Sequence, residues 1–364
     1  MLAPAARAGA ITGRREDAMS DMMNAVVLRE HGGPEVLSYE AIAKPEPGPR
    51  EVRVAVRAVA MNHLDVWVRR GNPAFHLEYP HRLGSEIAGV VDALGPGVDD
   101  LEIGEPVVVN PGLSCGVCRA CLSGQDNLCP RYRILGENAQ GGYAEYACVP
   151  RQNIAPYPGE LSFPDAAAAL LTFQTAWQML VHKARIEPGQ VVLVHGAASG
   201  VGVAGIQVAR LFGARVIATA GSDEKLALAK ELGAEAVINY REQDFVREVK
   251  ALTERRGVDV VFEHVGGEIM TGSVKATRNG GRIVTCGATA GFKPEIDLRH
   301  VFFRQIEILG STMGSKGDLL ATIEHVRAGA LRPIVHEILP LKEAAAGHRL
   351  LEERKAAGKV VLTP

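Results

Sequence analysis

Hydrophobic and polar positions follow two different patterns along the chain, and the change falls near residue 164. Between residues 23 and 160, short alternating or β-branched runs, such as residues 51–58 and 105–109, are separated by turns. The turns are rich in Gly and Pro, as in KPEPGPR at residues 44–50 and LGPGV at 94–98. Short strands between tight turns predict a small twisted barrel of antiparallel strands.

A helical pattern begins at Pro164 and Asp165, two residues that suit the first turn of a helix. Apolar runs then alternate with helical segments at βαβ spacing, at residues 191–194, 216–219, 258–262 and 281–286. This alternation predicts an α/β domain with a doubly wound parallel sheet. We expect it to cover residues 161–311, and we expect residues 312–364 to return to the first domain through a last strand at 358–362.

Length and composition limit the function. A chain of 364 residues with 47% hydrophobic residues suits two domains of ordinary size. The net charge of -2 gives no basic field for nucleic acid, and no stretch reaches the roughly 20 apolar residues that cross a bilayer. We therefore expect a cytoplasmic protein that acts on a small molecule and binds neither nucleic acid nor membrane.

Residues 1–22 contain arginines and acids but no continuous apolar run, so they do not resemble a secretory signal. We expect a disordered N-terminal tail. Met19, Met22 and Met23 all precede the first strand-like run, which favours a misplaced start codon. A transit peptide is the weaker alternative because of Glu16 and Asp17.

Four of the six cysteines lie close together in a loop, residues 112–130, with the spacing Cys115-x2-Cys118-x2-Cys121-x7-Cys129. Such clustering indicates a metal site rather than disulfides. Four thiolates match a closed tetrahedral zinc site, which stabilises a loop and leaves no position open for substrate. We therefore predict one structural Zn²⁺ per chain, with an iron–sulfur centre or empty thiols as the alternatives.

A glycine-rich turn follows the strand at 191–194 and precedes a helical run at 203–212. Glycines let the backbone approach a pyrophosphate, and amides at the helix start face the anion. The order of strand, turn and helix predicts a dinucleotide site, with a purely structural turn as the alternative. The expected contacts are Gly196, Ala198, Ser199, Gly200, Val201 and Gly202.

The tip of the second parallel strand, residues 219–222, carries no carboxylate to hold ribose hydroxyls. We expect Ser222 and Lys225 to bind a 2′-phosphate, with Tyr240 or Arg241 contacting the adenine or the phosphate. NADP(H) is therefore preferred over NAD(H). Asp223 lies close enough to the tip to keep NAD(H) as an alternative, in which Lys225 is a solvated helix residue.

The segment LGSEIAGVV at residues 83–91, the four-cysteine loop and the turn AASGVG at 197–202 resemble the medium-chain dehydrogenase/reductase superfamily. The resemblance covers residues 23–362. It implies a GroES-like β-barrel catalytic domain with a zinc lobe, a Rossmann cofactor domain and a short return. It also implies a homodimer or homotetramer through Rossmann edge strands, which places residues 306–310 at an interface.

Alcohol dehydrogenases of this superfamily bind a catalytic zinc through an early cysteine, a histidine before a glutamate, and a later cysteine or acid. The matching positions here are Asn62, Ser85 and a position near Leu171, none of which is a zinc ligand. The Asn62-x-x-Asp65 pattern resembles instead the quinone oxidoreductase branch, which uses NADPH without a catalytic metal. The alternative is a zinc-dependent alcohol dehydrogenase with displaced ligands drawn from His63, Asp65, His76, His81 and Glu86.

Without a Lewis acid, hydride must reach an electrophilic carbon of an enone, a quinone or an activated carbonyl, while hydrogen-bond donors stabilise the oxyanion. We expect Asn62, Ser85 and Thr175 to face the nicotinamide and substrate, Asp65 to orient local hydrogen bonds, and Glu86 to lie behind them. The structural alternatives are a helix cap for Asn62 and Asp65, a turn residue for Ser85, and an arginine partner for Glu86.

The resemblance places His63 near the pyrophosphate and Lys359 at the cofactor, with surface solvation as the alternative for Lys359. The carboxyl ends of the parallel strands are expected to line the nicotinamide. Their residues are Val265, Gly287, Ala288 and Ser311. The leading hypothesis is thus an NADP(H)-dependent oxidoreductase, and a non-enzymatic NADPH-binding, crystallin-like protein is a further alternative.

Overall fold

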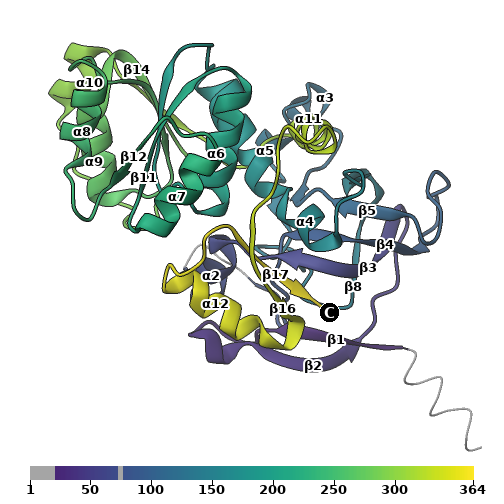
Figure 1. The fold of residues 1–364 in the computed structure, drawn as a ribbon. Coiled ribbons are helices and arrows are strands. Elements are labelled where there is room, and N and C mark those ends of the chain that lie inside the picture. The colour runs from purple at the N-terminus through teal and green to yellow at the C-terminus, as the bar shows by residue number, and fades with distance from the viewer. Residues whose placement is uncertain (1–20, 73–76) are drawn as a thin grey trace, which may run out of the picture.

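The computed structural model describes residues 21–72 and 77–364, and these form two halves built on separate sheets (Figure 1). The predicted tail lies outside the described residues over 1–20, and Met22 already opens the first strand. His76, named above as a candidate ligand, also lies outside them. No helix of the described residues is long and apolar enough to cross a membrane.

The first half is built on a seven-stranded sheet in which β17 (Lys359–Thr363) pairs with both β16 (Val335–Pro340) and β3 (Glu51–Ala60). The C-terminal strand therefore joins the N-terminal sheet. Alternate residues of β3, including Val52 and Val54, are fully buried against the core. The sheet is completed by β4 (Glu86–Leu94), β5 (Pro106–Val109), β8 (Tyr146–Pro150) and β9 (Ile154–Pro156).

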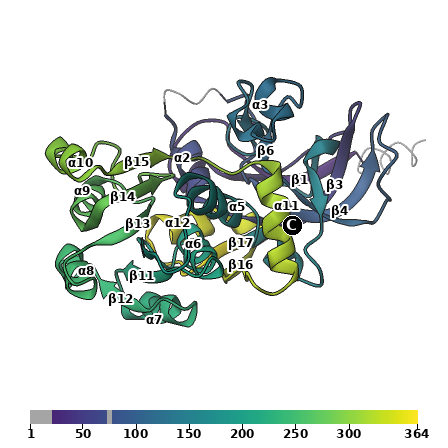
Figure 2. The same cartoon turned by 90° about the horizontal axis from the view of Figure 1, so that it is seen from above.

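Smaller elements surround this sheet. A two-stranded ribbon, β1 (Met22–Val27) and β2 (Ser38–Ala43), lies at one end. Helices α2 (His63–Arg70) and α12 (Ala344–Glu352) lie next to each other near the second half (Figures 1 and 2). Short 3₁₀ helices cover Pro34–Val36, Arg151–Asn153 and Leu341–Glu343.

The second half is the predicted parallel doubly wound sheet, with strand order β12-β11-β10-β13-β14-β15. Val191 and Leu193 of β10 pack on one face, and Val192 and Val194 pack on the other, because successive side chains alternate. Burial on both faces explains the continuous apolar runs in the sequence. The strands are β10 (Val191–Val194), β11 (Arg215–Ala220), β12 (Ala236–Asn239), β13 (Val258–Glu263), β14 (Thr277–Thr285) and β15 (Glu307–Gly310).

Helices cover both faces of this sheet (Figure 2). The first, α6, follows β10 directly, as the glycine-turn pattern predicts. Residues of α8 and α9 pack in the cluster on the opposite face from α6. The helices are α6 (Gly200–Leu211), α7 (Asp223–Glu231), α8 (Phe245–Leu252), α9 (Gly267–Ala276) and α10 (Leu298–Arg304).

The helical segment that connects the halves is broken, whereas the sequence pattern predicts a run of helix from Pro164. It divides into α4 (Phe163–Ala168), α5 (Leu171–Trp177) and a π-helix (Gln178–Lys183). Leu170 leaves the helical region with φ -91° and ψ -87°, and the amide of Leu171 donates to Glu86 of β4 at 2.6 Å. A tertiary hydrogen bond therefore competes with continuation of the helix.

The cysteine loop forms a lobe beside α11 (Lys316–Arg327) in both ribbon views (Figures 1 and 2). Asp126 accepts hydrogen bonds from the backbone and the ammonium of Lys316, at 2.9 and 3.3 Å. Asn127 donates to the carbonyl of Met313 at 3.1 Å. The lobe contains β6 (Gly112–Leu113), α3 (Arg119–Leu122), a 3₁₀ helix (Asp126–Leu128) and β7 (Arg133–Ile134).

Candidate functional site

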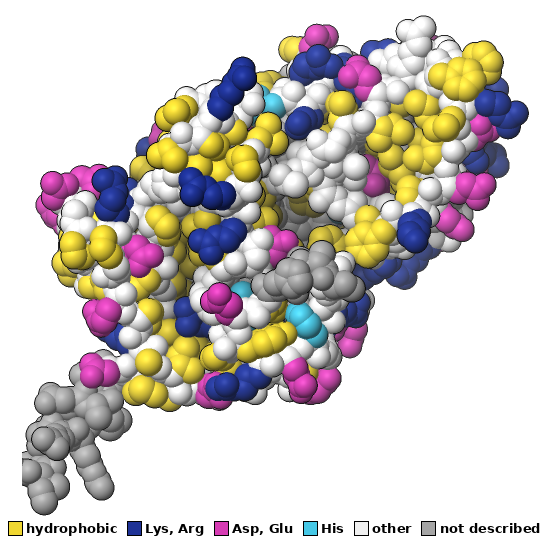
Figure 3. Space-filling model, turned by 180° about the vertical axis from the view of Figure 1, so that it is seen from behind, with side chains coloured by type: hydrophobic (Ala, Val, Ile, Leu, Met, Phe, Trp, Pro, Cys, Tyr) yellow, Lys and Arg dark blue, Asp and Glu magenta, His cyan; other side chains and the backbone are white. Residues whose placement is uncertain are grey.

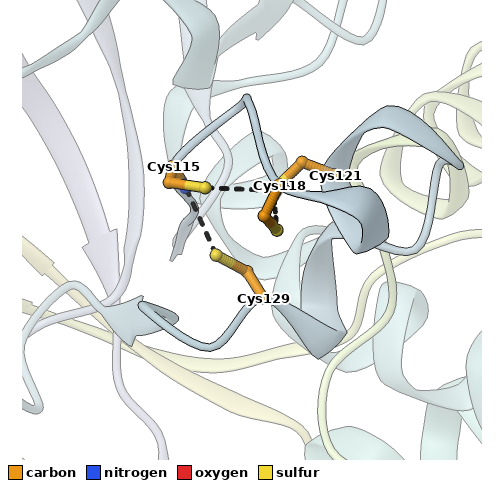
Figure 4. Close-up of side chains that lie close together, drawn as sticks. All are labelled: Cys115, Cys118, Cys121 and Cys129. Carbon is orange, nitrogen blue, oxygen red and sulfur yellow. Dashed lines mark hydrogen bonds between the residues drawn. The ribbon is translucent and has the colours of Figure 1, made fainter.

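The four cysteines of the lobe point toward one another from the loop, from α3 and from the end of the 3₁₀ helix (Figure 4). Their sulfurs all lie within 4.8 Å of one another, and Cys115 Sγ lies 3.8 Å from Cys121 Sγ. A tetrahedral zinc–thiolate site has sulfur–sulfur edges of about 3.8 Å. The backbone amides of Cys115 and Arg131 approach Cys129 Sγ at 3.4 Å, which suits a thiolate. This donor set fits zinc.

The glycine turn leaves no room for larger residues at its tightest point. Gly196 has φ +55°, and a Cβ on Gly202 would overlap the carbonyl of Gly196. Ser199 begins α6 by accepting the amide of Gly202 at 3.0 Å on its hydroxyl. Ala198 accepts the amide of Gly358 at 2.8 Å, which ties the turn to the C-terminal segment. Together with the amides of Gly200 and Val201 in the first turn of α6, this cradle fits a pyrophosphate.

Basic side chains gather at the tip of β11, where the ribose end of a dinucleotide would lie. The Lys225 ammonium donates to the carbonyl of Arg354 at 2.5 Å. Burial lowers the pKa of Lys225, and the charges of Arg241 and Arg354 lower it further. Tyr240 and Arg241 lie over Gly221, where an added Cβ would come within 3.0 Å of both side chains.

Ser222 precedes α7 and makes no side-chain capping hydrogen bond, so its hydroxyl is not used by the helix. Asp223, in contrast, is exposed in the first turn of α7. The predicted 2′-phosphate residues Ser222 and Lys225 thus stand at the tip with additional cations nearby. Arg354 is a residue that sequence reasoning missed, because it follows α12 in the other half of the molecule.

The carboxyl ends of β13 and β14 meet the first half of the molecule. A Cβ on Gly287 would lie 3.6 Å from the ring of Trp67 in α2, and one on Gly266 would lie 2.9 Å from Ala288. Trp67 also stacks edge-on with His63 at a centroid distance of 5.2 Å. The structure therefore brings Gly287, Ala288 and α2 to one junction between the halves, and Trp67 is a second residue that sequence reasoning missed.

Three other predicted cofactor residues lie around this junction. Val265 follows β13, and its amide donates to the Glu263 carboxylate at 2.9 Å. Ser311 follows β15, and its amide donates to Thr285 at the end of β14 at 2.9 Å. Burial lowers the pKa of His63, and the charge of Arg70 adds to the effect, which favours a neutral imidazole.

Asp65 is fully buried and holds the start of α2. Its two carboxylate oxygens accept the amides of Asn62 at 2.7 Å and of Gly84 at 2.9 Å. Burial raises the pKa of Asp65 to about 6. The predicted role in orienting local hydrogen bonds agrees with this geometry, and so does the helix-cap alternative, because α2 begins at His63.

Glu86 and Lys359 form a buried pair with Asn62. Lys359 donates to Glu86 Oε2 and, at 2.7 Å, to Asn62 Oδ1, and Asn62 Nδ2 donates to Glu86 Oε2 at 2.8 Å. Lys359 is 4% exposed and Glu86 is 0% exposed. The alternatives of an arginine partner for Glu86 and surface solvation for Lys359 are therefore wrong. The Lys359 ammonium is committed to this pair, and its stem lies against Gly200 of the glycine turn, where a Cβ would come within 2.7 Å of Cδ.

The prediction that Ser85 offers a donor to the substrate is wrong. Its side chain is fully buried, and its hydroxyl donates to the carbonyl of Leu135 at 2.7 Å. Thr175 of α5 behaves differently, because its hydroxyl is buried without a hydrogen-bond partner in the described residues. A buried hydroxyl without a partner is costly unless a bound group satisfies it. Thr175 thus fits a bound cofactor or substrate, whereas Ser85 holds a loop.

Comparison with known proteins agrees with this arrangement. The zinc-binding dehydrogenase family model matches residues 200–328, and the alcohol dehydrogenase GroES-like domain model matches residues 48–159. The chain belongs to the medium-chain dehydrogenase/reductase superfamily. It is an oxidoreductase, and the predicted combination of a GroES-like domain with a Rossmann domain is confirmed.

Individual relatives align over nearly the whole chain. A quinone oxidoreductase of Sus scrofa is 30% identical, covering 94% of this chain and 98% of its own. A 2-haloacrylate reductase of Burkholderia sp is 30% identical, with 94% and 99% covered. A crystal structure of an NAD-dependent alcohol dehydrogenase is 55% identical, covers 94% of this chain and 100% of its own, and superimposes with a TM-score of 0.91.

Proposed function

We propose that this oxidoreductase uses NADP(H) to transfer a hydride to or from a small enone, quinone or carbonyl substrate without a catalytic zinc. The observation that carries the proposal is the side-chain chemistry at the catalytic positions of the superfamily. Asn62 and Ser85 occupy these positions, and the nearby carboxylates of Asp65 and Glu86 already accept hydrogen bonds from the protein. Two relatives are named for the reduction of quinones and of a conjugated acid, which supports the same substrate class.

The acids beside Asn62 have little capacity left for a metal. Both oxygens of Asp65 accept backbone amides, while Glu86 accepts from Leu171, Asn62 and the Lys359 ammonium. A second cation placed here would also be repelled by Lys359. His81 lies elsewhere, with Nε2 at 3.2 Å from the carbonyl of Gly136. These contacts disfavour a zinc-dependent alcohol dehydrogenase with displaced ligands.

In place of a Lewis acid, polar side chains of the protein stabilise the negative charge that develops on the substrate oxygen. Bound at the junction, the dinucleotide supplies the hydride. Asn62, half-buried at the start of α2, offers its amide to the substrate, and the Thr175 hydroxyl supplies a second polar contact from α5. Trp67 lies against Gly287 at the end of β14, on the side of the first half of the molecule. Asp65 and Glu86 act behind these groups by holding the backbone and the Asn62 amide.

The preference for NADP(H) rests on the cations at the tip of β11. Lys225, Arg241 and Arg354 provide the charge that a 2′-phosphate requires, and the Ser222 hydroxyl adds a donor. The 55% identical structure carries the name of an NAD-dependent alcohol dehydrogenase, so a comparison of NADPH with NADH binding tests this proposal directly. Lys225→Met is expected to weaken NADPH binding about tenfold and NADH binding little. Lys230→Met in the same helix is the matched control.

A structural zinc in the lobe and an oligomer are part of the proposal. β15 is an edge strand of the Rossmann sheet, and Ile308 on it is exposed, together with Leu298, Phe302 and Phe303 of α10. Figure 3 shows hydrophobic side chains gathered at this end of the molecule. An exposed edge with apolar neighbours suits pairing with a second copy, as a homodimer or within a homotetramer.

The test combines metal analysis with activity on the purified protein. We expect one zinc per chain, oxidation of NADPH in the presence of quinones or cyclic enones, and activity that survives a mild chelator. Two zinc ions per chain, or loss of activity on mild chelation with recovery on zinc addition, would show a zinc alcohol dehydrogenase instead. Tight NADPH binding without turnover of quinones, enones or aldehydes would refute the enzymatic proposal.

A further inference from the structure

The network of Asn62, Glu86 and Lys359 is assembled by strand register from distant parts of the chain. Ala60 at the end of β3 pairs with Glu86 of β4 on one side and with Val361 of β17 on the other. Asn62 lies two residues after Ala60, and Lys359 lies two residues before Val361. The sheet thus sets a carboxylate and an ammonium beside one amide. Both charges are buried, which strengthens their interaction with the amide dipole.

These two charges determine which way the Asn62 amide points. Its nitrogen donates to Glu86 Oε2 at 2.8 Å, and its oxygen accepts from the Lys359 ammonium at 2.7 Å. The flipped amide would direct its NH₂ group at the ammonium and its oxygen at the carboxylate. Both contacts would then be repulsive, so a single orientation is stable.

The fixed orientation decides what Asn62 can offer a substrate. An amide nitrogen carries two N–H donors, and Glu86 takes one of them. The amide oxygen is engaged by a cation, so it is a poor acceptor for a substrate hydroxyl. The group left for the junction is therefore an N–H donor, and its positive character is increased by the lysine on the same amide.

We propose that Glu86 and Lys359 are positioning residues that hold Asn62 as a hydrogen-bond donor to the substrate oxygen, and that this selects substrates whose oxygen gains negative charge. The inference rests on the proposed function and adds to it the residues that stabilise this charge, for which a conjugated enone serves as the example. When a C–H bond forms at the β-carbon of an enone, the C=C electrons shift and the carbonyl oxygen becomes an enolate oxyanion. NADPH is oxidised to NADP⁺, and a solvent proton completes the α-carbon.

Cofactor binding must be separated from positioning in any test, because the Lys359 stem touches Gly200 and the neighbouring Gly358 bonds to Ala198. We therefore compare kcat at saturating NADPH and measure the Kd of NADPH for each variant. Asn62→Ala removes the donor, Lys359→Met and Glu86→Gln remove the charges, and Lys359→Arg restores the cation. Lys44→Met, which removes a half-buried lysine paired with Asp92, is the matched control.

Asn62→Ala is expected to lower kcat for an enone about 100-fold, the effect of losing one oxyanion donor. Lys359→Met and Glu86→Gln should lower kcat at least tenfold, with Lys359→Arg recovering most of the loss and Lys44→Met having no effect. The second readout is the pH at which bound 4-nitrophenol ionises in the NADP⁺ complex. If Asn62 and Lys359 had a purely structural role, their substitution would not change this pH. The phenolate should form at a lower pH in the wild type than in Asn62→Ala or Lys359→Met.

The proposal is overturned if Lys359→Met and Glu86→Gln keep kcat and the ionisation of bound 4-nitrophenol at wild-type values. If these two variants do not fold, Asn62→Ala decides, and a kcat within twofold of wild type refutes the role of the amide. These results differ from failure of the proposed function. In that case the wild-type enzyme itself reduces no enone or quinone with either nucleotide.

Discussion

His195, the residue between β10 and the glycine turn, should make the stability of the protein strongly dependent on pH. Its ring is buried between two hydroxyls, with Nδ1 at 3.0 Å from Thr219 Oγ1 and Nε2 at 2.9 Å from Ser273 Oγ. Burial lowers the pKa of His195 to about 3, and the neighbouring His264 contributes. The imidazole is therefore neutral in the folded protein between pH 5 and pH 7.

The direction of the pH dependence follows from the difference between the pKa of His195 in the folded protein and in the unfolded chain. An unfolded histidine has a pKa near 6.5, so as pH falls the unfolded chain binds a proton that the folded protein does not. The stabilisation is fully present above pH 6.5 and is lost progressively as pH falls toward the folded pKa. Between pH 7 and pH 5, linkage removes about 2 kcal/mol from the free energy of unfolding through this residue alone.

His195→Gln keeps a donor and an acceptor but cannot titrate. We expect the variant to lose about 2 kcal/mol less than the wild type between pH 7 and pH 5, whatever its stability at pH 7. Urea denaturation at both pH values measures this, with Trp177 as the probe, because its ring packs 5.3 Å from Phe212 at the end of α6. An identical pH dependence in wild type and variant would refute the argument.

Three further predictions concern the turn, the lobe and α2. Gly202→Ala should weaken NADPH binding at least tenfold in fluorescence titrations, because its Cβ would overlap the Gly196 carbonyl, whereas Gly317→Ala in α11 should not. Asp126→Ala should lower the free energy of unfolding by about 1–2 kcal/mol, since the backbone amide of Lys316 loses its acceptor and its ammonium keeps only Ser114, and chelation of the proposed lobe zinc should lower the melting temperature in the same way. Asp65→Asn should cost about 2 kcal/mol in a denaturant titration, because one of its two bound amides would face an NH₂ group, with Asp99→Asn as the exposed comparison.

The parts of the fold that the sequence predicts are those that depend on local order. The β10–turn–α6 unit follows from a short apolar run, closely spaced glycines and a helical pattern within about twenty residues. The convergence of Cys115, Cys118, Cys121 and Cys129 follows from their spacing in one loop. In both cases the residues that act together are neighbours in the chain, so their types and intervals are sufficient.

The site at the junction depends instead on tertiary contacts that local pattern does not contain. Lys359 reaches Asn62 across 297 residues, and only the pairing of β3 with β17 brings them together. Ser85 occupies a catalytic position in sequence, yet the nearby carbonyl of Leu135 takes its hydroxyl. The break before Leu171 likewise arises because Glu86, far away in sequence, captures its amide. In each case a distant partner outcompetes the local preference.

The pairing of β17 between β16 and β3 also constrains how the protein is made. In the first sheet, the place between β3 and the edge strand β16 stays empty until residues 359–363 arrive, about three hundred positions after β3. The strands of the Rossmann half lie close together in the chain, so this half can fold before synthesis is complete. The first half is translated earlier, but its sheet keeps an unpaired strand edge until β17 is made. A nascent chain stalled before residue 359 should therefore present those edges to chaperones.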